Sequence, residues 1–548
     1  MKITRLSFAA VVACMATASF AATDLASAFK EGKLDGRVRA QYFFTDWDQN
    51  DQWNQTYNAA TGAATQATGT SSKSNLDSKG YAIGGSLIYK TSPLYGVSGG
   101  VGFYTTQNIA GLTETGANSN GRRDLVGSYK NTTSSDLFAR GPGAATDFSA
   151  GYSVLAQSYL QYDISKSSVK VGRFLMTNPF INPNDTKMIP VAIEGASANI
   201  QEFGDTAVIL DYAQRIKERG MTYFGNMADT GDTPDAIKNY YKTRYTVSST
   251  LNAVGGASGV TAAQLAQYGS GGDAPNVYMI GVKNKSVKDL ELQGWVMNWP
   301  DIVRQYMLEA NYNLKIGSIG LGLGARYMHQ SDQGAGDLIT PASGRSIYSY
   351  SGVTNGSPIG SRANDVNLKG DSDDKVDTNL YAVRAIVSYE KAKFLLAYAF
   401  TDKGGDLIAP WRGFPTEGYT RSMTQTDWVA NTKSYKAQLD YDFSGFIKGV
   451  SALLGYSYYD RDPSRIPYQS CTDRYYGNGD TKQWNFDVKY VVPYVKGLEW
   501  KVRTMIQKND IVPTSKTYGT NNSYATASEG FGNDTSNKEL RIEMNYFF

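Results

Sequence analysis

The chain ends in the stretch ELRIEMNYFF, residues 539–548, in which apolar and polar side chains alternate. Alternate residues of an extended strand point to opposite faces. One face of this strand therefore carries Leu540, Ile542, Met544, Tyr546 and Phe548, and the other carries Glu539, Arg541, Glu543 and Asn545. A face with three charges needs water, while an apolar face needs lipid or a core. This pattern predicts a strand of a transmembrane β-barrel, with one face in lipid and the other in a wet lumen.

The same alternation recurs upstream, most clearly in residues 34–44, 305–314, 434–443, 483–492 and 498–507. Aromatic residues on the apolar faces would suit interfacial girdles; they include Tyr306, Tyr312, Trp484, Tyr490 and Trp500. Along the whole chain the pattern predicts about eighteen strands, with sixteen as the alternative. They are expected to begin near residues 34, 81, 97, 156, 168, 205, 219, 277, 289, 304, 317, 379, 393, 432, 449, 483, 498 and 539.

The connections between these strands alternate between short and long. Brief turns are expected at 90–96, 165–167, 285–288, 315–316, 390–392, 444–448 and 493–497. Long polar segments are expected at 45–80, 106–155, 176–204, 227–276, 329–378, 402–431, 461–482 and 508–538, and only 299–303 breaks the alternation. Short periplasmic turns and long extracellular loops are typical of outer-membrane barrels. The predicted fold is therefore all-β, a transmembrane antiparallel β-barrel that forms one domain over residues 22–548.

The N-terminus resembles a secretory signal. Lys2 and Arg5 precede the apolar segment 6–18, and small residues lead to an expected cleavage after Ala21. The apolar segment is too short to span a bilayer. Residues 1–21 are thus predicted to be a signal peptide. The mature barrel is expected in the outer membrane of a Gram-negative cell, in contact with its lipid bilayer and lipopolysaccharide.

Composition excludes several classes of function. The chain has 54 basic and 51 acidic residues, so it lacks the strongly basic character of a nucleic-acid partner. Its one histidine, His329, has no neighbouring nucleophile motif, which argues against a hydrolase. Cys14 is expected to leave with the signal, and Cys471 alone can build neither a disulfide framework nor a cysteine zinc site. We therefore expect no enzyme activity, no metal site and no cofactor.

The polar faces of the strands are predicted to line the channel. Their basic members are Arg37, Arg39, Arg326, Arg384, Lys436, Lys489, Lys501, Arg503 and Arg541, and their acidic members are Glu309, Asp440, Asp487, Glu499 and Glu543. Opposed charged walls in a narrow pore create a transverse field that favours polar solutes. Closure pairs the first strand with the last and brings Arg37 and Arg39 close to Arg541. One hypothesis is a basic strip along this seam, and the alternative is cross-strand ion pairs with Asp35, Glu539 and Glu543.

A wide barrel needs a constriction, and residues 176–204 are the best candidate. This segment contains Pro179, Pro183 and Pro190, and apolar residues that can pack on the inner wall. Asp185, Lys187 and Glu194 would then face the narrowest part of the channel. The alternative is an ordinary external loop.

Several short motifs resemble the OprD-type porins. They are VGRF at 171–174 with Asn178-Pro179, Asp185, Pro190 and Glu194-Gly195; WPDI at 299–302; PWRGFP at 410–415 with Gly418-Tyr419; LDYDF at 439–443; and YVV at 490–492 with Lys496-Gly497-Leu498. The resemblance spans nearly the whole mature chain. The match departs at Phe174, where the family usually has Gln after Gly-Arg.

The resemblance implies an eighteen-stranded barrel whose third and seventh loops fold inward, with a basic ladder along the lumen. It makes Arg37, Arg39, Arg384 and Arg503 candidates for this basic ladder. Asp185 and Trp411 become candidates for the constriction. Because Trp411 lies in the segment 402–431, this segment is the candidate for the second inward loop. It also implies substrates such as basic amino acids, small peptides and small carboxylates. The terminal Tyr546, Phe547 and Phe548 look like the aromatic signal that barrel-assembly machinery recognises.

The expected function is a porin, a passive channel for small hydrophilic solutes, with a possible preference for charged molecules such as amino acids or carboxylates. The alternative is a plugged barrel that acts as a surface adhesin or structural protein. Both a monomer and a homotrimer fit the sequence, because outward apolar strips for lipid and for a partner look the same.

Overall fold

The structure is a computed structural model of the chain. It describes residues 22–47, 55–57, 64–66, 78–108, 151–221, 223–230, 233, 237, 274–335, 376–411, 413, 418–423, 429–462, 479–510 and 536–548. The predicted signal peptide, residues 1–21, lies outside the described residues, as does Cys471.

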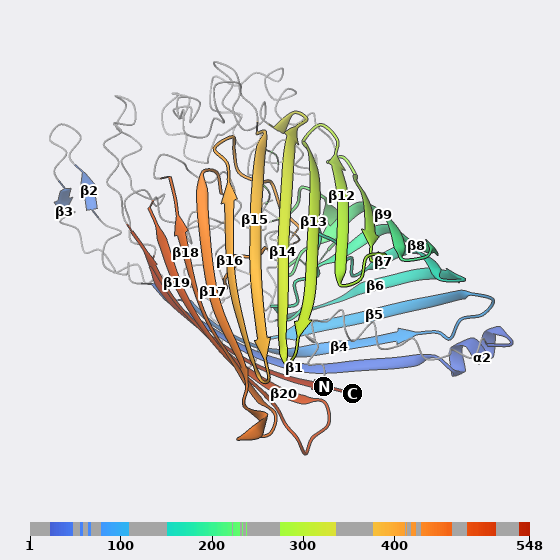
Figure 1. The fold of residues 1–548 in the computed structure, drawn as a ribbon. Helices are drawn as coiled ribbons and strands as arrows, with labels where there is room; N and C mark the ends of the chain where they lie inside the picture. Colours follow the sequence, from blue (N-terminus) through green and yellow to red (C-terminus); the bar gives the residue numbers. More distant parts are fainter. Residues whose placement is uncertain are drawn as a thin grey trace, which may run out of the picture.

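Eighteen antiparallel strands form a closed barrel, as predicted (Figure 1). Closure occurs at β1, which pairs with both β4 and β21. The strands are β1 (Lys33–Trp47), β4 (Ser78–Lys90), β5 (Val97–Gln107), β6 (Gly151–Ile164), β7 (Ser167–Phe174), β8 (Ala192–Phe203), β9 (Thr206–Lys217), β11 (Val277–Asn284), β12 (Leu290–Trp299), β13 (Val303–Ile316), β14 (Ile319–Asp332), β15 (Thr378–Tyr389), β16 (Ala392–Thr401), β17 (Thr432–Asp442), β18 (Val450–Asp460), β19 (Thr481–Val491), β20 (Leu498–Asn509) and β21 (Asn537–Phe547).

Smaller elements surround the barrel. The helix α2 (Leu25–Lys30) precedes β1 and begins with a capping box at Asp24. The strands β2 (Gln55–Tyr57) and β3 (Ala64–Gln66) pair with each other, the short β10 (Gly225–Asn226) pairs with the end of β9, and the 3-10 turn η2 (Phe443–Gly445) follows β17. Among the described residues, no helix is long and apolar enough to cross a membrane.

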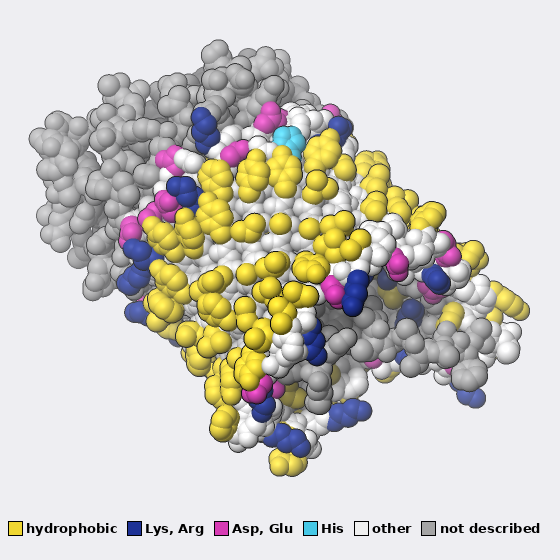
Figure 2. Space-filling view, in the orientation of Figure 1, with side chains coloured by type: hydrophobic (Ala, Val, Ile, Leu, Met, Phe, Trp, Pro, Cys, Tyr) yellow, Lys and Arg dark blue, Asp and Glu magenta, His cyan; other side chains and the backbone are white. Residues whose placement is uncertain are grey.

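The alternating pattern predicts which side of most strands faces outward. On β1, Arg37 and Arg39 are buried inside the barrel, whereas Val38 between them is 40% exposed on the outside. On β19, Trp484 faces outward and Asn485 is buried. Figure 2 shows the resulting hydrophobic bands across the outer face, with charged side chains towards the rims. In hydrocarbon such a closed sheet leaves no backbone hydrogen bond unmet.

One predicted strand is wrong and one was missed, although the total of eighteen is correct. The segment 192–203 was expected to belong to the loop 176–204, but it forms β8. The strand expected to begin near 219 does not form in the described residues. β9 ends at Lys217, its barrel neighbour is β11, and of the segment after it only Gly225–Asn226 pairs with β9. The inward face of β8 carries the apolar Ile193, which packs under an inward loop. The alternation between an apolar outer face and a polar inner face, on which the strand predictions relied, is therefore weak in this segment.

The two ends of the barrel differ as predicted. The end with short turns, called periplasmic below, has the connections 91–96, 165–166, 204–205, 285–289, 317–318, 390–391, 443–449 and 492–497. The β13–β14 hairpin turns through Gly317 and Ser318, and Gly317 has a φ of 58°, which glycine adopts without a steric penalty. At the other, extracellular end, all connections except 300–302 are long.

The interior of the barrel is filled unevenly. A large hydrophobic cluster joins residues of the loops 175–191, 218–276 and 402–431 to the inner faces of β7–β9 and β11–β16. A smaller cluster packs Met188 and Ile189 of the first loop against Phe43 of β1 and Tyr104 of β5. Neither cluster includes a residue of β17–β21. The inner faces of β19–β21 instead carry charges.

Candidate functional site: the constricted lumen

The loop 175–191 folds into the barrel and reaches β1, four strands away from β7 where it begins. The Asp185 carboxylate forms ion pairs with both Arg37 and Arg39, and its Oδ1 lies 2.9 Å from Arg39 Nη1. The same guanidinium donates a hydrogen bond to the Lys187 carbonyl at 2.6 Å. Asp185 therefore ties the tip of the loop to the inner wall.

Lys187 lies beside this anchor and is buried. Its Nζ sits 4.1 Å from the centroid of the Phe43 ring, a cation–π contact. The prediction that Lys187 belongs to the constriction loop fits this placement. Its ammonium, however, rests on the wall rather than standing out in the channel.

The stem of the loop has further anchors that were not predicted. The Lys217 ammonium donates to the Pro190 carbonyl at 3.2 Å, and Arg219 Nη1 donates to Thr186 Oγ1 at 2.7 Å. On the other side, the Asn178 amide donates to Asp211 at 2.9 Å. Asn178 Oδ1 accepts hydrogen bonds from the backbone N–H groups of Phe180 and Ile181. The asparagine of the Asn178-Pro179 motif and the basic residues Lys217 and Arg219 at the end of β9 were the only sequence signals for these roles.

Loop 402–431 also folds inward, as expected for the second inward loop. Gln305 of β13 donates to the Ile408 carbonyl at 2.8 Å, and the Ile408 N–H donates to Gln330 of β14 at 2.8 Å. Further along, the Met423 N–H donates to Gln483 of β19 at 3.0 Å. Glutamines on the inner wall thus satisfy the loop backbone where water is excluded.

Trp411 is the centre of the contacts between the inward loops. Its ring lies 4.7 Å from that of Trp299, and its Nε1 donates to the Met227 carbonyl at 2.8 Å. Its backbone carbonyl accepts the N–H of Asn182, and the neighbouring Gly413 N–H donates to the Phe180 carbonyl, both at 3.1 Å. Trp411 is buried and joins three loops into one body, and its role in the constriction stays a prediction.

Tyr419, also in loop 402–431, forms a platform for two predicted channel-lining arginines. The guanidinium carbons of Arg384 and Arg326 lie 4.3 and 4.8 Å from its ring centroid. Burial, and then the negative charge of Glu309, raise the pKa of Tyr419 to about 12. The ring is therefore uncharged at physiological pH. Arg326 also pairs with Glu309, and Arg384 Nη2 donates to Asn311 at 2.5 Å.

The seam between β1 and β21 forms as predicted, with Gln41 opposite Glu543 and Phe43 opposite Arg541. Of the two hypotheses for this seam, cross-strand ion pairing is present. Arg39 Nη2 lies 2.9 Å from Glu543 across the seam, whereas Arg541 pairs with Glu539 of its own strand, β21. Arg37, for which Asp35 was a possible partner, pairs with Asp185 of the loop instead.

The neighbouring strands β19 and β20 continue this wall of paired charges. Arg503 lies 2.8 Å from Asp487, and Lys489 lies 2.6 Å from Glu499. Lys501 lies opposite both Lys489 and Glu543 in register. On β17, Lys436 Nζ donates to the Arg421 carbonyl at 2.8 Å, and Asp440 accepts from Gln438 at 2.9 Å.

Glu194 is not part of the constriction, contrary to expectation. It lies on β8 opposite Arg173 of β7, and the two side chains form an ion pair of 2.8 Å. Arg173 shares its strand face with Val169 and Val171, which are exposed on the outside of the barrel. Glu194 is therefore on the outer face, near the extracellular rim. Its misassignment follows from the missed strand.

A closed barrel with an apolar outer surface and a charged lumen narrowed by inward loops is the architecture of an outer-membrane porin. A family model described as outer membrane porin, OprD family, matches residues 127–523. The chain belongs to this family, and its barrel crosses the outer membrane with many strands.

Solved structures of similar fold include porins of Pseudomonas aeruginosa and Acinetobacter baumannii. OccK9 (OpdG) of Pseudomonas aeruginosa is 12% identical, with a TM-score of 0.60, and the match covers 95% of this chain and 99% of that one. OccK8 (OprE) of the same organism is 16% identical, with a TM-score of 0.58 over 95% and 98% of the two chains. OccAB4 of Acinetobacter baumannii is 14% identical, with a TM-score of 0.58 over 94% and 98%. No curated protein sequence matches the chain.

Proposed function

We propose that this porin is a passive diffusion channel for small hydrophilic solutes and that it favours charged molecules such as amino acids or carboxylates. The uneven filling of the barrel carries the proposal. Loops and apolar side chains occupy the side of β7–β16, whereas the inner faces of β19–β21 bear charged groups outside both hydrophobic clusters. Lys489, Glu499 and Arg503 keep 31%, 23% and 20% of their side-chain surface exposed.

A solute that passes this wall meets both signs of charge. The inner faces of β19–β21 and β1 carry basic and acidic side chains next to one another. Charged groups that line a channel favour dipolar and charged solutes and disfavour apolar ones. Amino acids and carboxylates have the chemistry that this wall recognises. One structurally similar porin, OpdK of Pseudomonas aeruginosa, has been crystallised with vanillate, an aromatic carboxylate.

The alternative is a plugged barrel that serves as an adhesin or structural protein. The three interlocked loops favour it, because they fill a large part of the lumen. Conductance separates the two functions. The refolded chain should give stable ohmic steps in planar bilayers, and heat-denatured protein should give none. A correctly folded barrel that never conducts would refute the channel and support the plugged barrel.

Neutralising the basic wall should change ion selectivity. K501Q/R503Q removes two positive charges that face the lumen, so the reversal potential under a salt gradient should shift towards cations. The matched control is K433Q/K482Q, which neutralises two lysines on the outward face near the extracellular rim. The control should leave the reversal potential close to that of the unmodified protein. Equal shifts in both variants would place the conduction path away from β20.

A further inference from the structure

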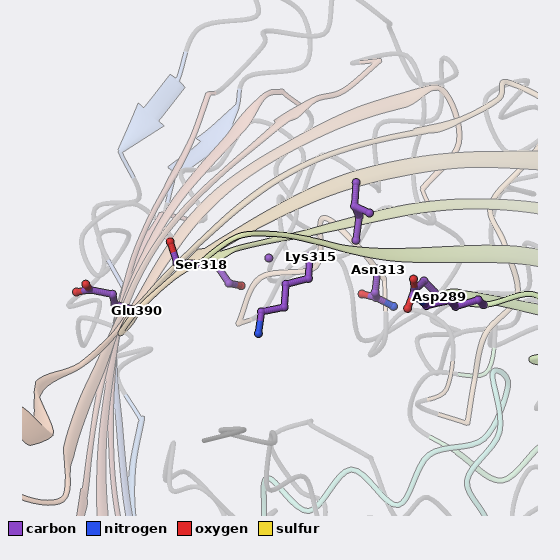
Figure 3. Close-up of a pocket in the computed structure, with 9 residues that line it drawn as sticks. Asp289, Asn313, Lys315, Ser318 and Glu390 are labelled. Atoms are coloured by element: carbon purple, nitrogen blue, oxygen red, sulfur yellow. The ribbon is translucent and has the colours of Figure 1, made fainter.

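A second polar site lies on the inner wall at the periplasmic end of β13–β15, away from the constriction. It is an open cavity of about 540 Å³, lined by Lys288, Asp289, Asn313, Lys315, Ser318 and Glu390 among others (Figure 3). We propose that this cavity binds zwitterionic small solutes as they leave the channel, with lysines holding a carboxylate and acids holding an ammonium group. The inference rests on the proposed passage of polar solutes and adds a site and a solute class to it.

The register of β13 places the cavity on the route through the barrel. Glu309, Asn311, Asn313 and Lys315 are successive residues of one strand face, which is the inner face because Glu309 is buried inside the barrel. Alternate residues of a strand are separated by roughly 7 Å. The face thus leads from Glu309, beside the Tyr419 platform, to Lys315 at the periplasmic mouth.

On this inner face of β13, the part near Glu309 and the part at the periplasmic mouth differ in their side-chain contacts. Glu309 pairs with Arg326 and accepts from Asn311 at 2.6 Å, so the upper groups are already occupied. In the cavity, by contrast, the side chains of Lys315, Asp289 and Glu390 form no ion pair or hydrogen bond with any other residue that the structure describes. Their charges therefore remain available to a solute. Because they are exposed to water, holding them there costs little desolvation energy.

The turns of three hairpins keep the opposite charges apart. Asp289 follows Lys288 in the β11–β12 turn, Lys315 is the last residue but one of β13, and Glu390 begins the β15–β16 turn. In Figure 3, the Lys315 side chain lies between Asp289 on one side and Glu390 on the other. A solute with one charge meets both attraction and repulsion here. A solute with an ammonium and a carboxylate can satisfy both kinds of group at once, which favours free amino acids and short peptides.

Saturation-transfer NMR on the refolded chain tests this site directly, with glycylglycine as the probe. The dipeptide should bind more tightly than acetate or methylammonium. K315Q/E390Q should weaken dipeptide binding about tenfold, since each lost charge-assisted hydrogen bond is worth about one factor of ten. The matched control, K448Q/K496Q, neutralises lysines of two other periplasmic turns and should bind as the unmodified chain does.

The outcomes separate this site from the proposed channel. Undiminished dipeptide binding to K315Q/E390Q, or equal binding of the three probes, would overturn the inference even if the barrel conducts. Binding that depends on Lys315 and Glu390 in a barrel that does not conduct would support the site and refute the channel. All four side chains changed in the two variants lie at turns, and the heat-modifiable migration of folded barrels checks that each variant has folded.

Discussion

Replacing Asp185 with asparagine is expected to lower the free energy of unfolding of the barrel by about 3 kcal/mol, because two buried arginines lose their shared counter-charge. Arg37 and Arg39 are 5% and 3% exposed, so water cannot replace the carboxylate. Arg39 keeps Glu543 as a partner, whereas Arg37 has no other ion pair among the described residues. The tip of the constriction loop would lose the ion pairs that hold it to the wall.

Urea unfolding of the barrel in lipid vesicles measures the loss of stability, and single-channel recordings should show larger and noisier current steps. D440N is the matched control. Asp440 also faces the lumen, but its contact is a hydrogen bond from the neutral Gln438 side chain, so this change should cost less than about 1 kcal/mol. A D185N barrel with unchanged stability and quiet current would mean that Asp185 does not hold the loop.

The strand pattern of this chain could be read from the sequence because most strands separate lipid from water. β21 and β19 carry charges or amides on one face and large apolar groups on the other, and both were predicted with the correct orientation. The pairing of β1 with β21 at the seam could also be predicted, because a closed antiparallel barrel must pair its first and last strands. Asp185 was singled out by the composition of its loop as well as by the family resemblance, and Trp411 by the resemblance alone.

The predictions failed for the strands and loops at which the inner face of the barrel does not meet water. On β8, Ile193 faces inward under a loop while Glu194 faces outward with Arg173, so the rule that charges line the lumen is reversed. The loop contacts of Gln305, Gln330 and Tyr419 depend on which segments fold inward, and alternation along a strand carries no information about this. The alternation of short and long connections did contain the missing signal, since Gly204-Asp205 is a turn that requires a strand before it.

Trp411→Ala is expected to destabilise the inward loops by about 3–5 kcal/mol, the usual cost of removing a buried tryptophan. The change empties the space beside Trp299 and removes the donor to the Met227 carbonyl, so the loops 175–191, 218–276 and 402–431 lose their common contact. Because the strands themselves remain paired, the barrel should still fold and insert. The channel should become wider, with a higher conductance and faster transitions.

Two variants show whether the effect comes from the interlocked loops. W411F keeps most of the ring but lacks the Nε1 donor, and it should cost about 1 kcal/mol with little change in conductance. W484A removes a tryptophan that is 50% exposed on the lipid-facing side, so it should leave the conductance unchanged. If W411A left the conductance as it is, the interlocked loops would not set the width of the path. The constriction would then depend on the Asp185 anchor and the charged wall of β19–β21.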